Sequence, residues 1–103
     1  MIELVCKITG PVGNNETVHN AIQEACSKSK VTILKKIDHK FEPQGYTALF
    51  LLAESHASVH TWPELGYALV DYFSCATDPC ISTFIQELEK AGFKVEDKQL
   101  IKR

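Results

Sequence analysis

The sequence predicts an α+β fold, a two-layer α/β sandwich in which two helices cover one face of a mainly antiparallel sheet. Three observations predict it. Six segments carry strand patterns, two carry the apolar stripe of an amphipathic helix, and the middle strands are joined by short turns. Short turns connect antiparallel neighbours, whereas parallel strands need long crossovers. The expected order is β-α-β-β-β-β-α-β in a single domain, residues 1–103.

Residues 2–8 alternate with a period of two and end at Gly10-Pro11, which predicts a strand with one buried face. A helix is expected next, starting at Asn14 or Asn15, which are good N-cap residues, and running to about Ser27. Its apolar stripe consists of Val18, Ala21, Ile22 and Ala25.

Two further strands flank the turn Pro43-Gln44-Gly45. In residues 31–41, Ile33, Ile37 and Phe41 share parity and are expected on one face. Residues 46–53 are apolar at nearly every position, which is typical of a central strand buried on both faces.

The second half of the chain contributes two strands, a helix and a last strand. Residues 55–60 alternate small and polar side chains, Trp62-Pro63 interrupts the pattern, and residues 67–75 resume it. Asp78 is expected to cap a helix with Pro79 at its first position and Gly92 after its end. Residues 93–101 alternate weakly, as an edge strand does.

Length and charge limit the kind of protein. The 103 residues are 45% hydrophobic and carry a formal net charge of −2. Such a chain buries one core but is too short for two lobes around a deep cleft, so a sizeable site is expected to need a second subunit. No basic patch points to nucleic acid, and no apolar run is long enough for a membrane span. The four cysteines are too sparse for a disulfide framework, which favours a cytoplasmic protein.

Residues 52–64 gather three hydroxyls, two imidazoles and two carboxylates. A polar strand face is one interpretation. Zinc is disfavoured because His56 and His60, four residues apart on a strand, would be about 13 Å apart. Cys75, His60 and Asp71 also fit a Cys-His-Asp hydrolase, in which imidazole takes the thiol proton. Residue types alone leave the site unassigned, with no metal expected.

A longer pattern runs through residues 41–75 without a gap. It comprises Glu54-Ser55-His56, His60-Thr61-Trp62-Pro63-Glu64 and Gly66-Tyr67-Ala68, followed by Asp71 and by Cys75 twenty residues after Ser55. This pattern resembles the prokaryotic S-adenosylmethionine decarboxylase proenzyme family. The flanking segments are compatible in order but weak in sequence.

The resemblance implies that the chain cleaves itself between Glu54 and Ser55, giving a beta chain of residues 1–54 and an alpha chain of residues 55–103. Ser55 would become a pyruvoyl group, the only cofactor expected, which withdraws electrons as S-adenosylmethionine loses CO₂. The product supplies aminopropyl groups for polyamine (spermidine) biosynthesis. His60 takes the position of a histidine that assists processing, and Cys75 that of a thiol acid that reprotonates the product.

Three further positions follow from the resemblance. Thr47 lies where the family often has a serine whose hydroxyl supports processing. Phe41 matches an aromatic residue that stacks on adenine, and Glu64 matches a carboxylate that binds the ribose hydroxyls.

Strand parity indicates a site shared between two chains. On a regular strand Ser55 and His60 face opposite ways, so His60 is not expected to reach its own Ser55. It is expected to serve Ser55 of a second chain across a two-fold axis. Family members likewise build composite sites in a homodimer.

Two alternatives stay open. Residues 1–8 lack the Gly-Arg-His start and the aromatic residue of the pocket-forming strand in bacterial members. Related pyruvoyl proteins of this fold decarboxylate arginine or ornithine, although retention of Phe41 and Glu64 favours S-adenosylmethionine. The other alternative is a non-catalytic homologue acting as a binding or regulatory subunit, which the presence of Ser55, His60 and Cys75 disfavours.

Overall fold

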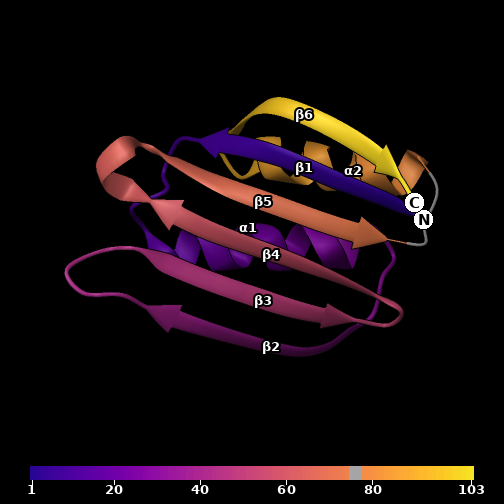
Figure 1. Ribbon diagram of the computed structural model, residues 1–103, viewed down its shortest axis with the longest axis horizontal. Coiled ribbons are helices and arrows are strands. Elements are labelled where there is room, and N and C mark those ends of the chain that lie inside the picture. Colours follow the sequence, from indigo (N-terminus) through magenta and orange to yellow (C-terminus); the bar gives the residue numbers. More distant parts are fainter. Residues whose placement is uncertain (75–77) are drawn as a thin grey trace.

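The computed structural model describes residues 1–74 and 78–103 (Figure 1). They form β1 (Ile2–Thr9), α1 (Asn15–Lys28), β2 (Ile33–Lys40), β3 (Tyr46–Leu52), β4 (Ser55–Trp62), the 3₁₀ turn η1 (Pro63–Leu65), β5 (Tyr67–Ser74), α2 (Asp78–Lys90) and β6 (Lys94–Lys102). The predicted order of strands and helices is confirmed.

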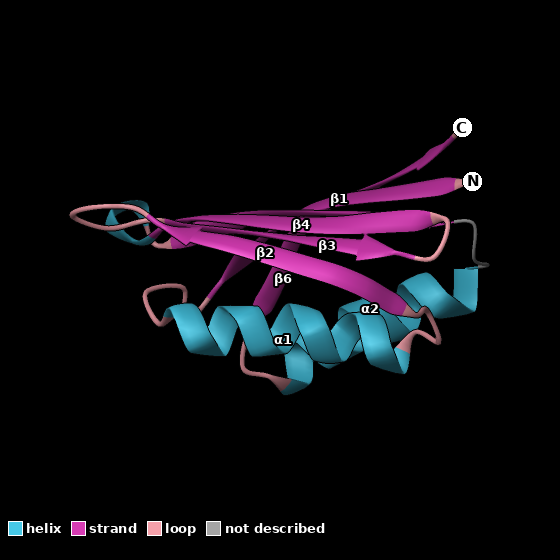
Figure 2. Cartoon of the chain, turned by 90° about the horizontal axis from the view of Figure 1, so that it is seen from below, coloured by secondary structure: helices cyan, strands magenta, loops and turns pink. Residues whose placement is uncertain are grey.

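One six-stranded sheet carries the fold, in the order β2-β3-β4-β5-β1-β6. Every neighbouring pair is antiparallel. Both helices cover the same face, and the opposite face carries no further layer (Figure 2). The predicted α+β sandwich is therefore confirmed, and the sheet has one covered face and one open face.

Capping residues mark the start of α1 and the end of α2 as predicted, whereas Asp78, predicted as the cap of α2, is the first residue of that helix. The Asn14 side chain accepts a hydrogen bond from the Thr17 N–H at 3.0 Å at the start of α1. Beyond α2, Gly92 takes a φ of 98°, and its N–H donates to the Glu89 carbonyl at 3.0 Å. Between helix and sheet, the rings of Tyr72 and Phe84 stack with centroids 4.2 Å apart. The core lies entirely in this layer.

The parity predicted for the second strand is wrong. A β-bulge interrupts the β2–β3 pairing between Ile33 and Lys35. Because the extra residue reverses the alternation, Ile33 packs against the core whereas Ile37 is 70% exposed. Phe41 lies after the last residue of β2, in the loop that leads to β3.

The continuous apolar run in β3 is explained by the open face. Ala48 and Phe50 point to the helices and are buried, whereas Leu49 and Leu51, which alternate with them, are about half exposed. Leu69 on β5 and Ile37 on β2 are also exposed. The open face thus exposes apolar side chains on β2, β3 and β5, and the polar side of β4 lies between those of β3 and β5.

No helix in the described part of the chain is long and apolar enough to cross a membrane.

Candidate active site

Ser55 is the first residue of β4 and follows a two-residue hairpin turn. Leu52 and Ser55 form the last pair of the β3–β4 ladder, so only Ala53 and Glu54 make the turn. The Ser55 side chain is 9% exposed, and its hydroxyl donates to the Ala53 carbonyl at 3.4 Å. Glu54 is exposed at the tip. The Glu54–Ser55 peptide bond therefore joins an exposed residue to a buried one, at the point where the turn ends and β4 begins.

His60 lies near the other end of β4, on the open face. It is paired in register with Thr47 of β3, and the Thr47 hydroxyl shares a hydrogen bond with His60 Nδ1. The imidazole centroid is 4.2 Å from that of Trp62 and 5.8 Å from that of Phe41. The predicted processing pair, Thr47 and His60, and the predicted adenine-stacking Phe41 therefore meet at one end of the open face.

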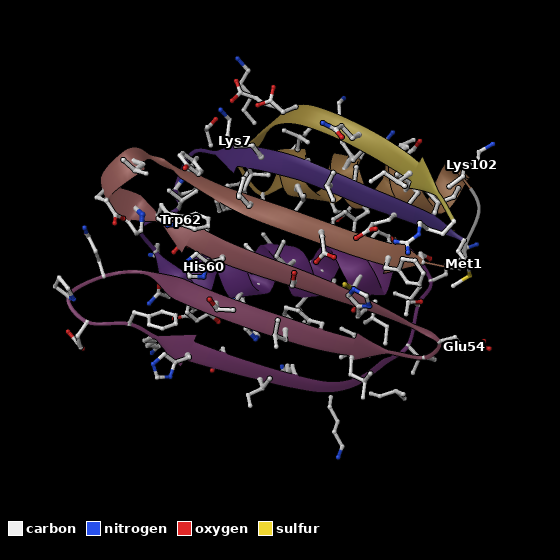
Figure 3. The ribbon with its side chains drawn as sticks, viewed as in Figure 1. Met1, Lys7, Glu54, His60, Trp62 and Lys102 are labelled. Atoms are coloured by element: carbon white, nitrogen blue, oxygen red, sulfur yellow. The ribbon has the colours of Figure 1, made fainter. Side chains whose placement is uncertain are left out.

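Ser55 and His60 do not meet within one chain. Burial alternates along β4, with Ser55, Ala57 and Val59 on the helix side and His60 on the open side. Five residues of strand also separate the two positions by about 16 Å. Figure 3 shows Glu54, which precedes Ser55, at the hairpin tip and His60 toward the opposite end of β4. This agrees with the parity argument made from the sequence.

A polar network at the centre of the open face was missed by the sequence argument. Asp71 of β5 accepts a hydrogen bond from the Ser58 hydroxyl through one carboxylate oxygen. Its other oxygen lies 3.4 Å from His56 Nε2. The strand register would have revealed this network, because Ser58 of β4 is paired with Asp71 of β5 and His56 is the diagonal neighbour of Asp71.

This network removes the support for a Cys75-His60-Asp71 triad. The Asp71 carboxylate is engaged by Ser58 and His56, and the His60 Nδ1 that an orienting carboxylate needs is engaged by Thr47. Cys75 itself lies outside the described residues. The hydrolase interpretation therefore has no geometric observation in its favour.

A shallow depression of about 440 Å³ joins the two groups on the open face. Its lining includes Lys7, Thr47, Ser58, His60, Leu69 and Asp71. The lining thus combines apolar side chains with the imidazole and the carboxylate. On a single chain the depression is open to solvent, so a facing surface is needed to enclose a ligand.

Phe41 and Glu64 lie in two different connections near His60: Phe41 between β2 and β3, and Glu64 on η1 between β4 and β5. The Phe41 ring stands edge-on to His39, with centroids 4.5 Å apart, and is 44% exposed. Glu64 is exposed on η1, two residues after Trp62. Both side chains are free to contact a ligand or a second chain.

The buried cysteines take no part in this chemistry. Burial raises the pKa of the Cys6 thiol to about 11 and that of the Cys26 thiol to about 12. Both thiols are therefore protonated near neutral pH and are not nucleophiles. Among the residues that the structure describes, no three His, Cys, Asp or Glu side chains are grouped to hold a metal ion.

The model of the family described as S-adenosylmethionine decarboxylase matches residues 3–100 of this chain. The chain belongs to the S-adenosylmethionine decarboxylase family. The match includes the hairpin turn, the Thr47–His60 pair and the central network.

Curated relatives carry the name S-adenosylmethionine decarboxylase proenzyme. One from Synechococcus sp. (strain WH7803) is 55% identical over 58 residues, which are 56% of this chain and 45% of the relative. One from Caldicellulosiruptor saccharolyticus is 39% identical over 84 residues, 79% of this chain and 68% of the relative. The aligned part of the chain thus spans about half the length of the cyanobacterial relatives that it matches.

A solved structure shares the whole fold of this member of the S-adenosylmethionine decarboxylase family. The crystal structure of the adenosylmethionine decarboxylase from Aquifex aeolicus VF5 superposes with a TM-score of 0.77 at 26% identity. The superposition covers 99% of this chain and 88% of the other. The weakly similar segments outside residues 41–75 therefore have the family's architecture as well.

Proposed function

We propose that this chain is a proenzyme that cleaves itself between Glu54 and Ser55, forms a pyruvoyl group from Ser55 and decarboxylates S-adenosylmethionine. Decarboxylated S-adenosylmethionine would then supply aminopropyl groups for polyamine synthesis. The observation that carries the proposal is the position of Ser55 at the turn–strand junction, within a family match that covers nearly the whole chain. A cut there leaves every strand intact.

The Ser55 side chain is suited to the first step. Its Oγ attacks the Glu54 carbonyl carbon, the C–N bond breaks, and the proton passes from Oγ to the freed amine, giving an ester. Removal of the Ser55 Cα proton with loss of the Glu54 carboxylate gives a dehydroalanyl terminus, and water then releases ammonia and leaves the pyruvoyl group. When present, this group serves as the electron sink for loss of CO₂. The burial of Ser55 would hold it away from bulk water.

The proton transfers need a base that the same chain does not place beside Ser55. We assign it to His60 of a second chain, whose ring Thr47 fixes through Nδ1. Because the Ser55 side chain points to the helix side, this imidazole would approach from the open face toward the Glu54–Ser55 peptide and the Ser55 Cα at the hairpin end, not toward the buried hydroxyl. In a two-fold dimer, contact of Ser55 with the partner's His60 requires the reverse contact as well. The axis would then pass near Ser58, at the centre of the open face.

The open face supplies the surface for this dimer. Its exposed apolar side chains, Ile37, Leu49, Leu51 and Leu69, would pack against their counterparts, with the Asp71 network between them. A facing sheet would also enclose the depression beside His60. Phe41 and Glu64 at its end would then contact the adenine and the ribose hydroxyls.

Leu49→Asp is expected to break the dimer and to stop cleavage, because it places a charge in the middle of an apolar interface. Leu100→Asp is the matched control: Leu100 is similarly exposed but pairs with Leu4, which points to the helix side. Analytical ultracentrifugation gives the mass in solution and denaturing mass spectrometry gives the cleaved fraction. A cleaving monomer would contradict the shared site.

Cys75→Ala is expected to leave substantial cleavage but to lower normal decarboxylation by about 100-fold or more, because the proposed acid that protonates the product is removed. The measurement compares cleaved fraction with CO₂ released per cleaved chain. Cys80→Ala, which removes another thiol, serves as the control. Full turnover by the Cys75 variant would remove Cys75 from the mechanism.

The function itself is tested by mass and by substrate. Purified protein is expected to contain two chains split after residue 54, the second carrying pyruvoyl instead of serine. It is expected to release CO₂ from S-adenosylmethionine and not from arginine or ornithine. A cleaved protein that acts only on arginine or ornithine would overturn the substrate, and a chain that stays intact would favour the non-catalytic alternative.

A further inference from the structure

The backbone at the proposed cleavage site holds a conformation that its side chain disfavours. Glu54 has a φ of 64°, in the left-handed region. There Cβ crowds the backbone, so glycine and, to a lesser degree, asparagine are the usual residues, and other side chains raise the energy of the turn. Glutamate at this position therefore makes the turn less stable than glycine or asparagine would.

Contacts on both sides prevent the turn from relaxing. Leu52 and Ser55 close it as a ladder pair, and both point into the core, where Leu52 is 1% exposed. The Ala53 N–H also donates to the Thr32 carbonyl at 2.9 Å. The flanking strands therefore impose the left-handed φ on Glu54, because moving the turn would shift buried side chains.

The proposed ester formation lengthens this turn. In the peptide, the Glu54 carbonyl carbon reaches the Ser55 Cα through one atom, the nitrogen. In the ester it reaches the same Cα through two atoms, Oγ and Cβ. The Oγ–C bond forms, the C–N bond breaks and the Oγ proton ends on the nitrogen, so no other reactant is needed. The longer link would let Glu54 leave the left-handed region while both strands stay in place.

We infer that the left-handed conformation of Glu54 is a device for self-cleavage: it raises the energy of the closed peptide turn relative to the ester and so speeds the first step. The inference rests on the proposed function. It assigns Glu54 a positioning role through its backbone, which is separate from any role of its carboxylate.

Four variants of Glu54 separate backbone from side chain. Glu54→Gly and Glu54→Asn tolerate the left-handed region, whereas Glu54→Gln and Glu54→Ala keep its energetic penalty and remove the charge. The full-length chains are made by pulsed cell-free synthesis, and the rate of cleavage is followed by denaturing mass spectrometry. The Gly and Asn variants are expected to cleave about five- to tenfold more slowly than the Gln and Ala variants.

Stability provides a second readout, and a merely structural role would not produce an inverse relation between stability and cleavage rate. In the Ser55→Ala background, which stays uncut, Glu54→Asn is expected to raise the midpoint of thermal unfolding relative to Glu54→Gln. The variant that stabilises the turn is thus the one that cleaves slowly. Equal cleavage rates for the Asn and Gln variants would overturn the inference while leaving self-cleavage in place. A wild-type chain that never cleaves would overturn both.

Discussion

Ser55→Ala is expected to abolish cleavage and decarboxylation together. Alanine removes the hydroxyl that is proposed to attack the Glu54 carbonyl, and no pyruvoyl group can form from alanine. Only one intact chain of about 11.5 kDa should then be found by denaturing mass spectrometry. Because Ser55 is the small, buried end of a ladder pair, the variant is expected to fold.

Ser27→Ala is the control for this result, since Ser27 is exposed on α1 and far from the hairpin along the chain. It should cleave and release CO₂ as wild type does. A Ser55→Ala protein that is still split after residue 54 would show that another nucleophile cuts the chain.

Co-expression of two variants that do not cleave normally is expected to restore cleavage of one of them. His60→Ala alone is expected to cleave at least about 100-fold more slowly, since a positioned base contributes on this scale. Ser55→Ala alone does not cleave. Co-expression of the two gives mixed dimers, in which Ser55 of the His60→Ala chain faces the intact His60 of its partner.

Distinct mass tags identify which chain is cut. With random pairing, about half of the His60→Ala chains lie in mixed dimers and are expected to cleave at the normal rate. The Ser55→Ala chains should remain whole. Absence of rescue, with mixed dimers present, would mean that His60 acts on its own chain.

Most of the fold could be predicted because local patterns and tertiary packing agree. The apolar stripes of α1 and α2 and the short turns predict the element order and the two layers, whereas the position of β1 between β5 and β6 was not predicted. The error in β2 has a physical origin: a bulge changes parity without a distinctive residue, since the unpaired residue, Leu34, is an ordinary apolar residue that follows Ile33.

The candidate site was predictable in composition but only partly in geometry. Parity alone separated Ser55 from His60, because the alternation along one strand needs no knowledge of its neighbours. The Thr47–His60 pair and the Asp71 network depend on the β3–β4 and β4–β5 registers, which no single strand encodes. The sequence therefore shows which groups are available, and pairing decides which of them meet.

The position of β1 in the sheet has a consequence for the life of the cut protein. Cleavage after residue 54 would leave β1, α1, β2 and β3 in one piece and β4, β5, α2 and β6 in the other. Yet β1 lies between β5 and β6, and β3 pairs with β4, so the pieces are interlocked. They can separate only if the sheet is dismantled. After denaturation, the two pieces must meet by diffusion, so the refolding rate of the cut protein would depend on its concentration. The uncut chain can refold to a protomer at a rate that does not depend on concentration. The intact chain would thus be needed to form the fold, and its cleavage afterwards would leave the fold in place.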